Sequence, residues 1–277
     1  MGPQFSAFSF VDRVTEVEPG LRAGGRFAIP EGLPDFPSCL VAEAVGQLAA
    51  WAAMAGLRFQ RRPVAGLTGH VEVLGSARAG QTLDLGVELE TCDPDAVAYR
   101  GWALVNGSPV LRLSHCVGPM LPMEEFDDIR TVQDQFALLC GPGATPGRFP
   151  GVTLPVLLPV DTPSGEAVRA AMQVPASAPF FADHFPRRPV FPGSLLLDAQ
   201  MRLAVRARLP VQGLPLVPCH VSDAKLRAFL APGQVVELEA RLLPEAGPRG
   251  ATVAVVARAN GKSVASARVA LISQEAT

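Results

Sequence analysis

Two segments of the chain are apolar on nearly every face of a helix, and each is followed by runs that alternate between apolar and polar residues. The first segment spans residues 36–54, and Glu43 and Gln47 are its only interior polar residues. Ser38 is placed to cap this helix. The second segment follows the turn pair Pro192-Gly193 and continues without further proline or glycine. Such apolar helices belong in a core, where a carboxylate is unexpected unless it is paired or functional.

The two halves of the chain repeat one another at a constant offset of 155 residues, since 192 − 37 = 155. The aligned pairs keep residue type and spacing: Pro37 and Pro192, Leu40 and Leu195, Glu43 and Asp198, Ala44 and Ala199. Further along, each half has a turn, an alternating strand and an Asn-Gly pair, at 106–107 and at 260–261. Asn-Gly between alternating runs is a strong hairpin signal. The pattern therefore predicts a tandem duplication of strand, buried helix and antiparallel meander.

A polar segment and then a stretch rich in proline and glycine separate the two copies. Residues 123–139 predict a polar helix, and residues 141–150 predict a linker. We therefore expect a first copy at residues 1–122, an inter-copy linker at 123–152 and a second copy at 153–277. The first strand of the second copy is expected at residues 156–160.

Composition narrows the class of protein. The 277 residues are 48% hydrophobic and 18% charged, which suits a chain with a large core. The net charge of −2 argues against binding nucleic acid by phosphate neutralisation. No run of about eighteen apolar residues predicts a membrane span, and the N-terminus does not resemble a signal peptide. Five cysteines without a C-x-x-C pair favour reduced thiols, so we expect a cytoplasmic protein.

The strongest motif in the chain is a histidine followed by a proline-rich loop and the second apolar helix. It reads His184-Phe185-Pro186, then residues 189–193 as Pro-Val-Phe-Pro-Gly, then Asp198 fourteen residues after the histidine (198 − 184 = 14). This stretch resembles the signature of the β-hydroxyacyl-acyl-carrier-protein dehydratases of the hotdog fold. Residues 11–20, Val-Asp-Arg-Val through Pro-Gly, are similar to that family's opening strand.

The resemblance, combined with the internal repeat, implies an α+β double hotdog. In this fold each copy wraps a curved antiparallel sheet around a long buried helix. The two tandem copies are expected to pair as a pseudo-dimer, because a two-fold interface can survive fusion of its subunits. The family's site is shared, with the histidine of one subunit facing the acid on the other subunit's helix.

The two copies have diverged in the residues that this site needs. The family's acid-x-x-x-Gln pattern is intact as Glu43 and Gln47 in the first copy, whereas Arg202 replaces the glutamine in the second. Ile29 occupies the position equivalent to His184. The resemblance therefore implies a composite site, with His184 as base, Glu43 as acid and Gln47 in support. Asp198 is the alternative acid, and the mirror site of Ile29 and Asp198 is expected to be inactive.

The resemblance also implies how a substrate would be held. The backbone at Gly193, at the start of the second helix, would bind the thioester oxygen. An apolar tunnel lined by Phe181, Phe185 and Phe191 would hold the acyl chain. Arg187, Arg188 and Arg202 would help to dock an acidic acyl carrier protein. We expect no metal or redox cofactor, a substrate tethered through phosphopantetheine on a carrier protein or coenzyme A, and possible further homodimerisation.

The expected reaction is dehydration of a (3R)-hydroxyacyl thioester to the trans-2-enoyl thioester, in fatty-acid, polyketide or polyene synthesis. Two alternatives stay open. One is a hotdog thioesterase, with Glu43 or Asp198 as base for water. The other is a non-catalytic partner that binds acyl chains or supports an active dehydratase. His70, His115 and His220 lack partners at metal-ligand spacing, so we interpret them as structural.

Overall fold

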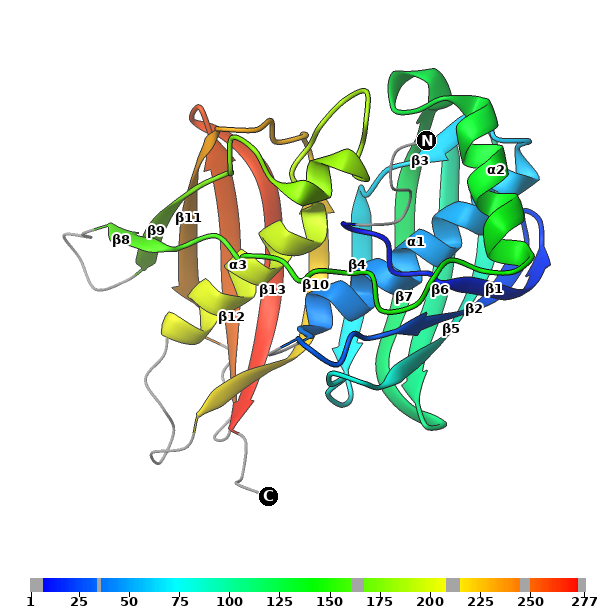
Figure 1. Cartoon of the computed structure of the whole chain (residues 1–277). Coiled ribbons are helices and arrows are strands. Elements are labelled where there is room, and N and C mark those ends of the chain that lie inside the picture. Colours follow the sequence, from blue (N-terminus) through cyan, green and yellow to red (C-terminus); the bar gives the residue numbers. More distant parts are fainter. Residues whose placement is uncertain (1–6, 34–35, 161–166, 208–214, 245–249, 274–277) are drawn as a thin grey trace.

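The computed structural model describes residues 7–33, 36–160, 167–207, 215–244 and 250–273 (Figure 1). The first copy consists of β1 (Arg13–Glu18), β2 (Arg22–Ala28), α1 (Ser38–Gly56), β3 (Arg61–Pro63), β4 (Leu67–Val73), β5 (Thr82–Cys92), β6 (Ala96–Val105) and β7 (Ser108–Pro122). The short helix η1 (Met123–Glu125) and α2 (Ile129–Cys140) follow. The second copy consists of β8 (Leu158–Val160), β9 (Val168–Gln173), η2 (Pro179–Ala182), α3 (Gly193–Arg206), β10 (Leu216–Leu226), β11 (Val235–Leu242), β12 (Gly250–Ala259) and β13 (Lys262–Ser273).

The described strands form one sheet in which the second half reverses the order of the first. The order is β1-β2-β5-β6-β7-β4, then β10-β13-β12-β11-β9-β8, with β3 paired to β7 off this path. The two copies meet where β4 pairs antiparallel with β10, with Val71 opposite Val221. α1 and α3 lie against the same side of this sheet, one in each half (Figure 1). The predicted double hotdog, with its copies paired as a pseudo-dimer, is confirmed.

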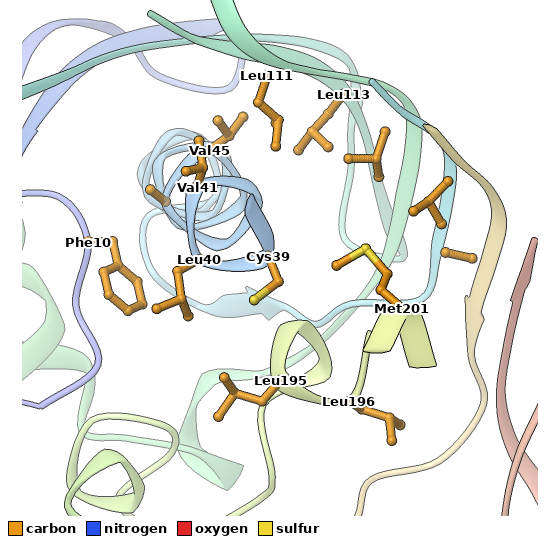
Figure 2. Close-up of a cluster of buried hydrophobic side chains, with 14 of the residues drawn as sticks. Phe10, Cys39, Leu40, Val41, Val45, Leu111, Leu113, Leu195, Leu196 and Met201 are labelled. Atoms are coloured by element: carbon orange, nitrogen blue, oxygen red, sulfur yellow. The ribbon is translucent and has the colours of Figure 1, made fainter. Parts of the chain in front are cut away.

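The two central helices are held by burial of their apolar residues. Ten of the nineteen residues of α1 are buried. α1 packs against β2, β5 and β6, and Figure 2 shows Leu111 and Leu113 of β7 beside Val41 and Val45. Among the described residues, α1 is the helix whose length and composition would allow it to cross a membrane. Here its apolar surface is used by the core. Pro37 is the N-cap of α1 and Ser38 its first residue, so the expected Ser38 cap does not form.

Both predicted Asn-Gly hairpins form as the sequence indicates. Asn106 and Gly107 have φ angles of 51° and 77°, and Asn260 and Gly261 have φ angles of 51° and 74°. Two consecutive residues with positive φ are the requirement of a type I′ turn, which matches the twist of the flanking strands. Along β12 every second residue is buried, as expected for a strand with one face on the core.

The segment between the copies packs against both of them. Its polar helix begins later than predicted, at Ile129, where the Asp128 side chain accepts a hydrogen bond from the N–H of Thr131 at 3.0 Å. Before this helix, the fully buried ring of Phe126 meets the ring of Phe185 with centroids 4.9 Å apart. The segment between the copies therefore packs against the loop that carries His184. The first strand of the second copy is shorter than expected, since β8 begins at Leu158.

Candidate active site

His184 lies in the loop between η2 and α3, and its ring is fixed on two sides. Its backbone N–H donates to the carbonyl of Phe180 at 2.9 Å, and its Nδ1 lies 3.3 Å from the carbonyl oxygen of Val190. Its ring stacks on Phe185, with centroids 4.3 Å apart, and meets the edge of Phe8 at 5.6 Å. A carbonyl oxygen can only accept a hydrogen bond, so Nδ1 carries the proton and Nε2 is the basic nitrogen.

The electrostatic surroundings favour the neutral form of His184. Burial lowers the pKa of His184 from its usual value of 6.5. The nearby Glu43 carboxylate opposes this effect, whereas the Arg62 guanidinium lowers the pKa further. Neutral imidazole is the form that accepts a proton, so the lowered pKa keeps His184 unprotonated and able to act as a base at neutral pH.

On α1, Glu43 and Gln47 lie on one face because they are four residues apart. The Gln47 side-chain amide donates to Glu43 Oε1 at 3.0 Å and to the Phe8 carbonyl at 3.0 Å, and it accepts from the Phe10 N–H at 2.8 Å. Gln47 therefore holds Glu43 Oε1 in one position, and Oε2 is the oxygen that can carry a proton.

Residues 7–10 connect α1 to the histidine loop of the other copy. The N–H groups of Ala7 and Phe8 each donate to Asp183 Oδ2 at 2.8 Å, while Phe8 and Phe10 also bond to Gln47. Asp183 precedes His184, so this N-terminal segment ties the loop of one copy to the helix of the other.

A cavity of about 260 Å³ lies where these elements meet. His184, Glu43, Gln47 and Gly193 all line it, whereas Asp198 does not. The structure thus brings the histidine of the second copy together with the acid of the first. The arrangement supplies a neutral base, a positioned carboxyl group and, at the first turn of α3, backbone N–H groups without an intrahelical acceptor.

Asp198 is instead held in an ion pair within the second copy. Its Oδ2 lies 2.7 Å from Arg202 Nε, and its side chain is only 8% exposed. Arg202 also donates to the Pro155 carbonyl at 3.0 Å. Asp198 further interacts with the Cys39 thiol, whose pKa is raised well above its usual value by burial first and then by the charges of Asp198 and Glu43. Cys39 points from α1 toward α3 (Figure 2).

Of the three phenylalanines predicted to line the tunnel, one lies outside the cavity. Phe185 and Phe191 line the cavity, but Phe181 does not. Phe181 instead packs against the Phe180 ring in η2, with centroids 4.6 Å apart. Ile29 is buried, and its N–H donates to the Gln81 carbonyl at 2.9 Å, so an aliphatic core residue replaces the mirror histidine.

The three arginines that were predicted to dock a carrier protein make contacts within the chain. Asp198 and the Pro155 carbonyl bind the Arg202 guanidinium, so Arg202 has a structural role inside the second copy. Arg188 pairs with Glu125 at 2.9 Å. Arg187 donates to the Glu124 carbonyl at 3.1 Å. Both residues therefore attach the histidine loop to η1, although each side chain remains about half exposed.

Sequence reasoning missed Arg62, which lines the cavity from β3. Its guanidinium carbon lies 4.5 Å from the centroid of the Phe185 ring. Burial lowers the pKa of Arg62 to about 10, against the opposing charges of Asp127 and Glu43. Arg62 lies in an ordinary polar run of the sequence, far from either motif, so no local signal could have identified it.

The three remaining histidines come together on the sheet at the junction of the copies. His70 Nδ1 and His220 Nε2 are 3.1 Å apart, and the rings of His70 and His115 have centroids 5.6 Å apart. Among the described residues, no group of three or more His, Cys, Asp or Glu side chains is arranged to hold a metal ion.

Comparisons with known proteins show the family to which the chain belongs. The model of the ApeI-like family, described as ApeI dehydratase, matches residues 161–268. A 3-hydroxyacyl-[acyl-carrier-protein] dehydratase FabZ of Thermus thermophilus is 34% identical over 137 residues, which cover 48% of this chain and 93% of the relative. The chain belongs to the FabZ-like hotdog family.

Solved structures share the fold over nearly the whole chain. The dehydratase domain of PpsC from Mycobacterium tuberculosis, in complex with C12:1-CoA, superposes with a TM-score of 0.60 at 15% identity, covering 97% of this chain and 100% of that one. The 12:0-ACP thioesterase from Umbellularia californica gives a TM-score of 0.55 at 11% identity, covering 92% and 95%. At these identities the likeness concerns the fold alone, and the proteins that share it include a dehydratase domain and a thioesterase.

Proposed function

We propose that this FabZ-like protein dehydrates a (3R)-hydroxyacyl thioester to the trans-2-enoyl thioester at a single composite site. The observation that carries the proposal is the placement of His184 and Glu43 on opposite copies but in one cavity. Elimination of water needs a base for the α-proton and an acid for the leaving oxygen, and in this cavity His184 and Glu43 are our candidates for these roles.

In the proposed mechanism, His184 Nε2 takes the α-proton of the substrate. The electron pair of the broken C–H bond forms the C=C bond as the C–O bond to the β-hydroxyl breaks. Glu43 donates a proton to the departing oxygen, which leaves as water. The proton on His184 then returns to Glu43, directly or through solvent, and restores the site. Each of the two roles would contribute about 10²–10⁴-fold to the rate.

The thioester oxygen gains negative charge as the α-proton leaves. α3 begins at Gly193, which lines the cavity, and no side chain caps the backbone N–H groups of its first turn. These groups and the positive end of the helix dipole would stabilise the developing charge.

The substrate carrier belongs to the proposal as well. A phosphopantetheine thioester, on an acyl carrier protein or coenzyme A, would deliver the acyl group past Phe185 and Phe191 into the cavity. The exposed halves of the Arg187 and Arg188 side chains would contribute to docking an acidic carrier. A cytoplasmic location is in keeping with five unpaired cysteines.

A thioesterase is the second candidate, because solved structures of this fold include one. It would use Glu43 as a base for water and release a free thiol. The hydrogen bond from His184 Nδ1 to Val190, which leaves Nε2 as the base, favours the dehydratase.

The test is hydration of a crotonyl thioester, the reverse reaction, by wild type, His184→Ala and Glu43→Gln. Absorbance follows loss of the enoyl group, and a thiol reagent follows release of free thiol in the same sample. We expect hydration by the wild type alone. Thiol release without hydration would establish the thioesterase, and wild-type activity retained by His184→Ala would refute the proposed base. A wild type inert in both readouts, on carrier-protein and coenzyme A thioesters alike, would favour the non-catalytic partner.

A further inference from the structure

Two buried polar atoms in the cavity wall have no hydrogen-bond partner among the described residues. They are Ser194 Oγ and Gln200 Nε2, both on α3. Gln200 is only 3% exposed, and both residues line the cavity. Buried polar groups are nearly always hydrogen-bonded, so an unpartnered amide in a cavity wall indicates that something else supplies its partner.

Gln200 occupies the cavity face of α3 at a distance from the proposed reacting centre. Gly193, Leu196, Leu197 and Gln200 all line the cavity. Their spacing of three, four and seven residues from Gly193 puts them on one side of the helix. At 1.5 Å per residue, Gln200 lies about 10 Å along the axis from Gly193, where the thioester would bind. An acyl chain leaving the thioester along α3 would therefore pass Gln200.

The cavity that Gln200 lines also has apolar side chains, both on α3 and on the strands. Leu196 and Leu197 precede it on the helix, and Ala224 and Ala265 line the cavity from β10 and β13. These side chains suit a hydrocarbon chain, but none can accept a hydrogen bond from an amide. A plain hydrocarbon chain would leave the Nε2 donor without a partner, whereas a chain with an oxygen acceptor beside it would gain a hydrogen bond.

We propose that Gln200 is a specificity-determining residue and that the preferred acyl chain carries a neutral hydrogen-bond acceptor where it passes this amide. The acceptor would be a hydroxyl or keto oxygen, because a carboxylate would be costly to bury beside a neutral amide. This inference names the substrate class of the proposed dehydration and rests on that function. It sets the site apart from one that binds saturated chains of every length.

Binding tests the inference without needing turnover. The probes are stable S-alkyl pantetheine thioethers of one chain length: an all-carbon parent and a series in which a single keto oxygen moves along the chain. Calorimetry gives Kd for wild type, for Gln200→Leu and for Leu197→Met. Leu197→Met changes the neighbouring cavity residue at nearly constant volume and serves as the matched control.

We expect one keto position to bind wild type about tenfold more tightly than the parent, which equals ~1.4 kcal/mol. This preference should vanish in Gln200→Leu and persist in Leu197→Met. The inference is overturned if the parent binds wild type as tightly as every keto compound, or if the preference survives in Gln200→Leu. Should Gln200→Leu fail to fold, Gln200→Met replaces it in the same comparison.

The proposed dehydration and the proposed specificity of Gln200 can be refuted independently. A wild type that shows the keto preference but no hydration of any enoyl thioester would keep the specificity of Gln200 and refute the dehydration. A wild type that hydrates enoyl thioesters but binds all chains equally would keep the dehydration and refute the specificity.

Discussion

Replacing Asp198 with asparagine removes the charge that neutralises Arg202 inside the second copy. Asp198 is aligned by sequence with Glu43, and the family motif alone would make it the acid beside His184. The structure gives it a different partner, since its Oδ2 is 2.7 Å from Arg202 Nε. We therefore expect Asp198→Asn to lower stability and to leave turnover nearly unchanged.

The size of the stability loss follows from the burial of the pair. Removing one partner of a buried ion pair costs about 3–5 kcal/mol, because the other charge stays buried and unpaired. The side chain of Asp198 is 8% exposed, but that of Arg202 is 31% exposed and keeps its bond to the Pro155 carbonyl. Partial access to water should reduce the loss to roughly 2 kcal/mol. In a chain of this size, that loss lowers the Tm by about 4–8 °C.

The assay compares Asp198→Asn with Glu43→Gln, the matched change in the first copy. Thermal unfolding gives the Tm, and crotonyl thioester hydration gives kcat. For Glu43→Gln we expect the opposite pattern, with a Tm close to wild type and kcat lowered by about 10²-fold or more. A double variant, Asp198→Leu with Arg202→Met, removes both charges and should recover most of the lost Tm.

One outcome would refute the reasoning. If Asp198→Asn abolishes hydration at an unchanged Tm, while Glu43→Gln remains active, then the acid that works with His184 is Asp198 of the same copy. The composite site would then be wrong, whatever the geometry of the cavity. If Asp198→Asn lowers both the Tm and kcat, the double variant distinguishes a structural from a catalytic role of Asp198. A structural role predicts that kcat recovers together with the Tm.

Three further predictions follow from individual groups. Burial lowers the pKa of His184, and the Arg62 guanidinium lowers it further, so the acid limb of kcat/KM should lie below pH 6.5. Arg62→Gln should move that limb to higher pH. An unmoved limb would show that Arg62 does not act on His184. Burial raises the pKa of Asp12 to about 6 from 3.8, so the stability it contributes is present at low pH and lost as pH rises through 6. In urea unfolding, the stability of Asp12→Asn should therefore rise relative to wild type between about pH 4 and pH 6, and a constant difference would contradict this. A Cβ at Gly118 would lie 2.4 Å from the Val64 carbonyl oxygen, so Gly118→Ala should cost about 1–3 kcal/mol, whereas Gly32→Ala, with nothing within 4 Å, should cost less than half as much.

The fold could be predicted from the sequence because its signals are local and occur twice. An apolar helix, a turn and an Asn-Gly hairpin recur at the same offset, and each element has its own physical cause. The Asn260-Gly261 turn forms because these residues tolerate positive φ, whatever surrounds them. The errors lie at element ends, such as Ser38, where the preceding Pro37 takes the cap position.

The site could be predicted only in part, because half of its contacts join residues far apart in the chain. The motif identifies His184, and the internal repeat together with the acid-x-x-x-Gln pattern identifies Glu43. These signals give no indication of Arg62, or of the bonds from Ala7 and Phe8 to Asp183, which span about 175 residues. Arg202 is predicted to help dock a carrier protein, although Asp198 lies four residues before it. At this spacing, opposite charges on a helix pair. That ion pair was within reach of sequence reasoning.

The asymmetry of the two copies has a physical explanation in these contacts. A duplicated chain begins with two equal sites, and a helix acid that no longer meets a histidine becomes a buried charge with nothing to offset it. Arg202 offsets that charge at Asp198, in the position where Gln47 supports Glu43 in the other copy. The same exchange would convert one acid from a proton donor into half of an ion pair. α3 lines the cavity with Gly193 and Gln200, so under the proposed function α1 would supply the acid and α3 the wall along which the substrate would lie.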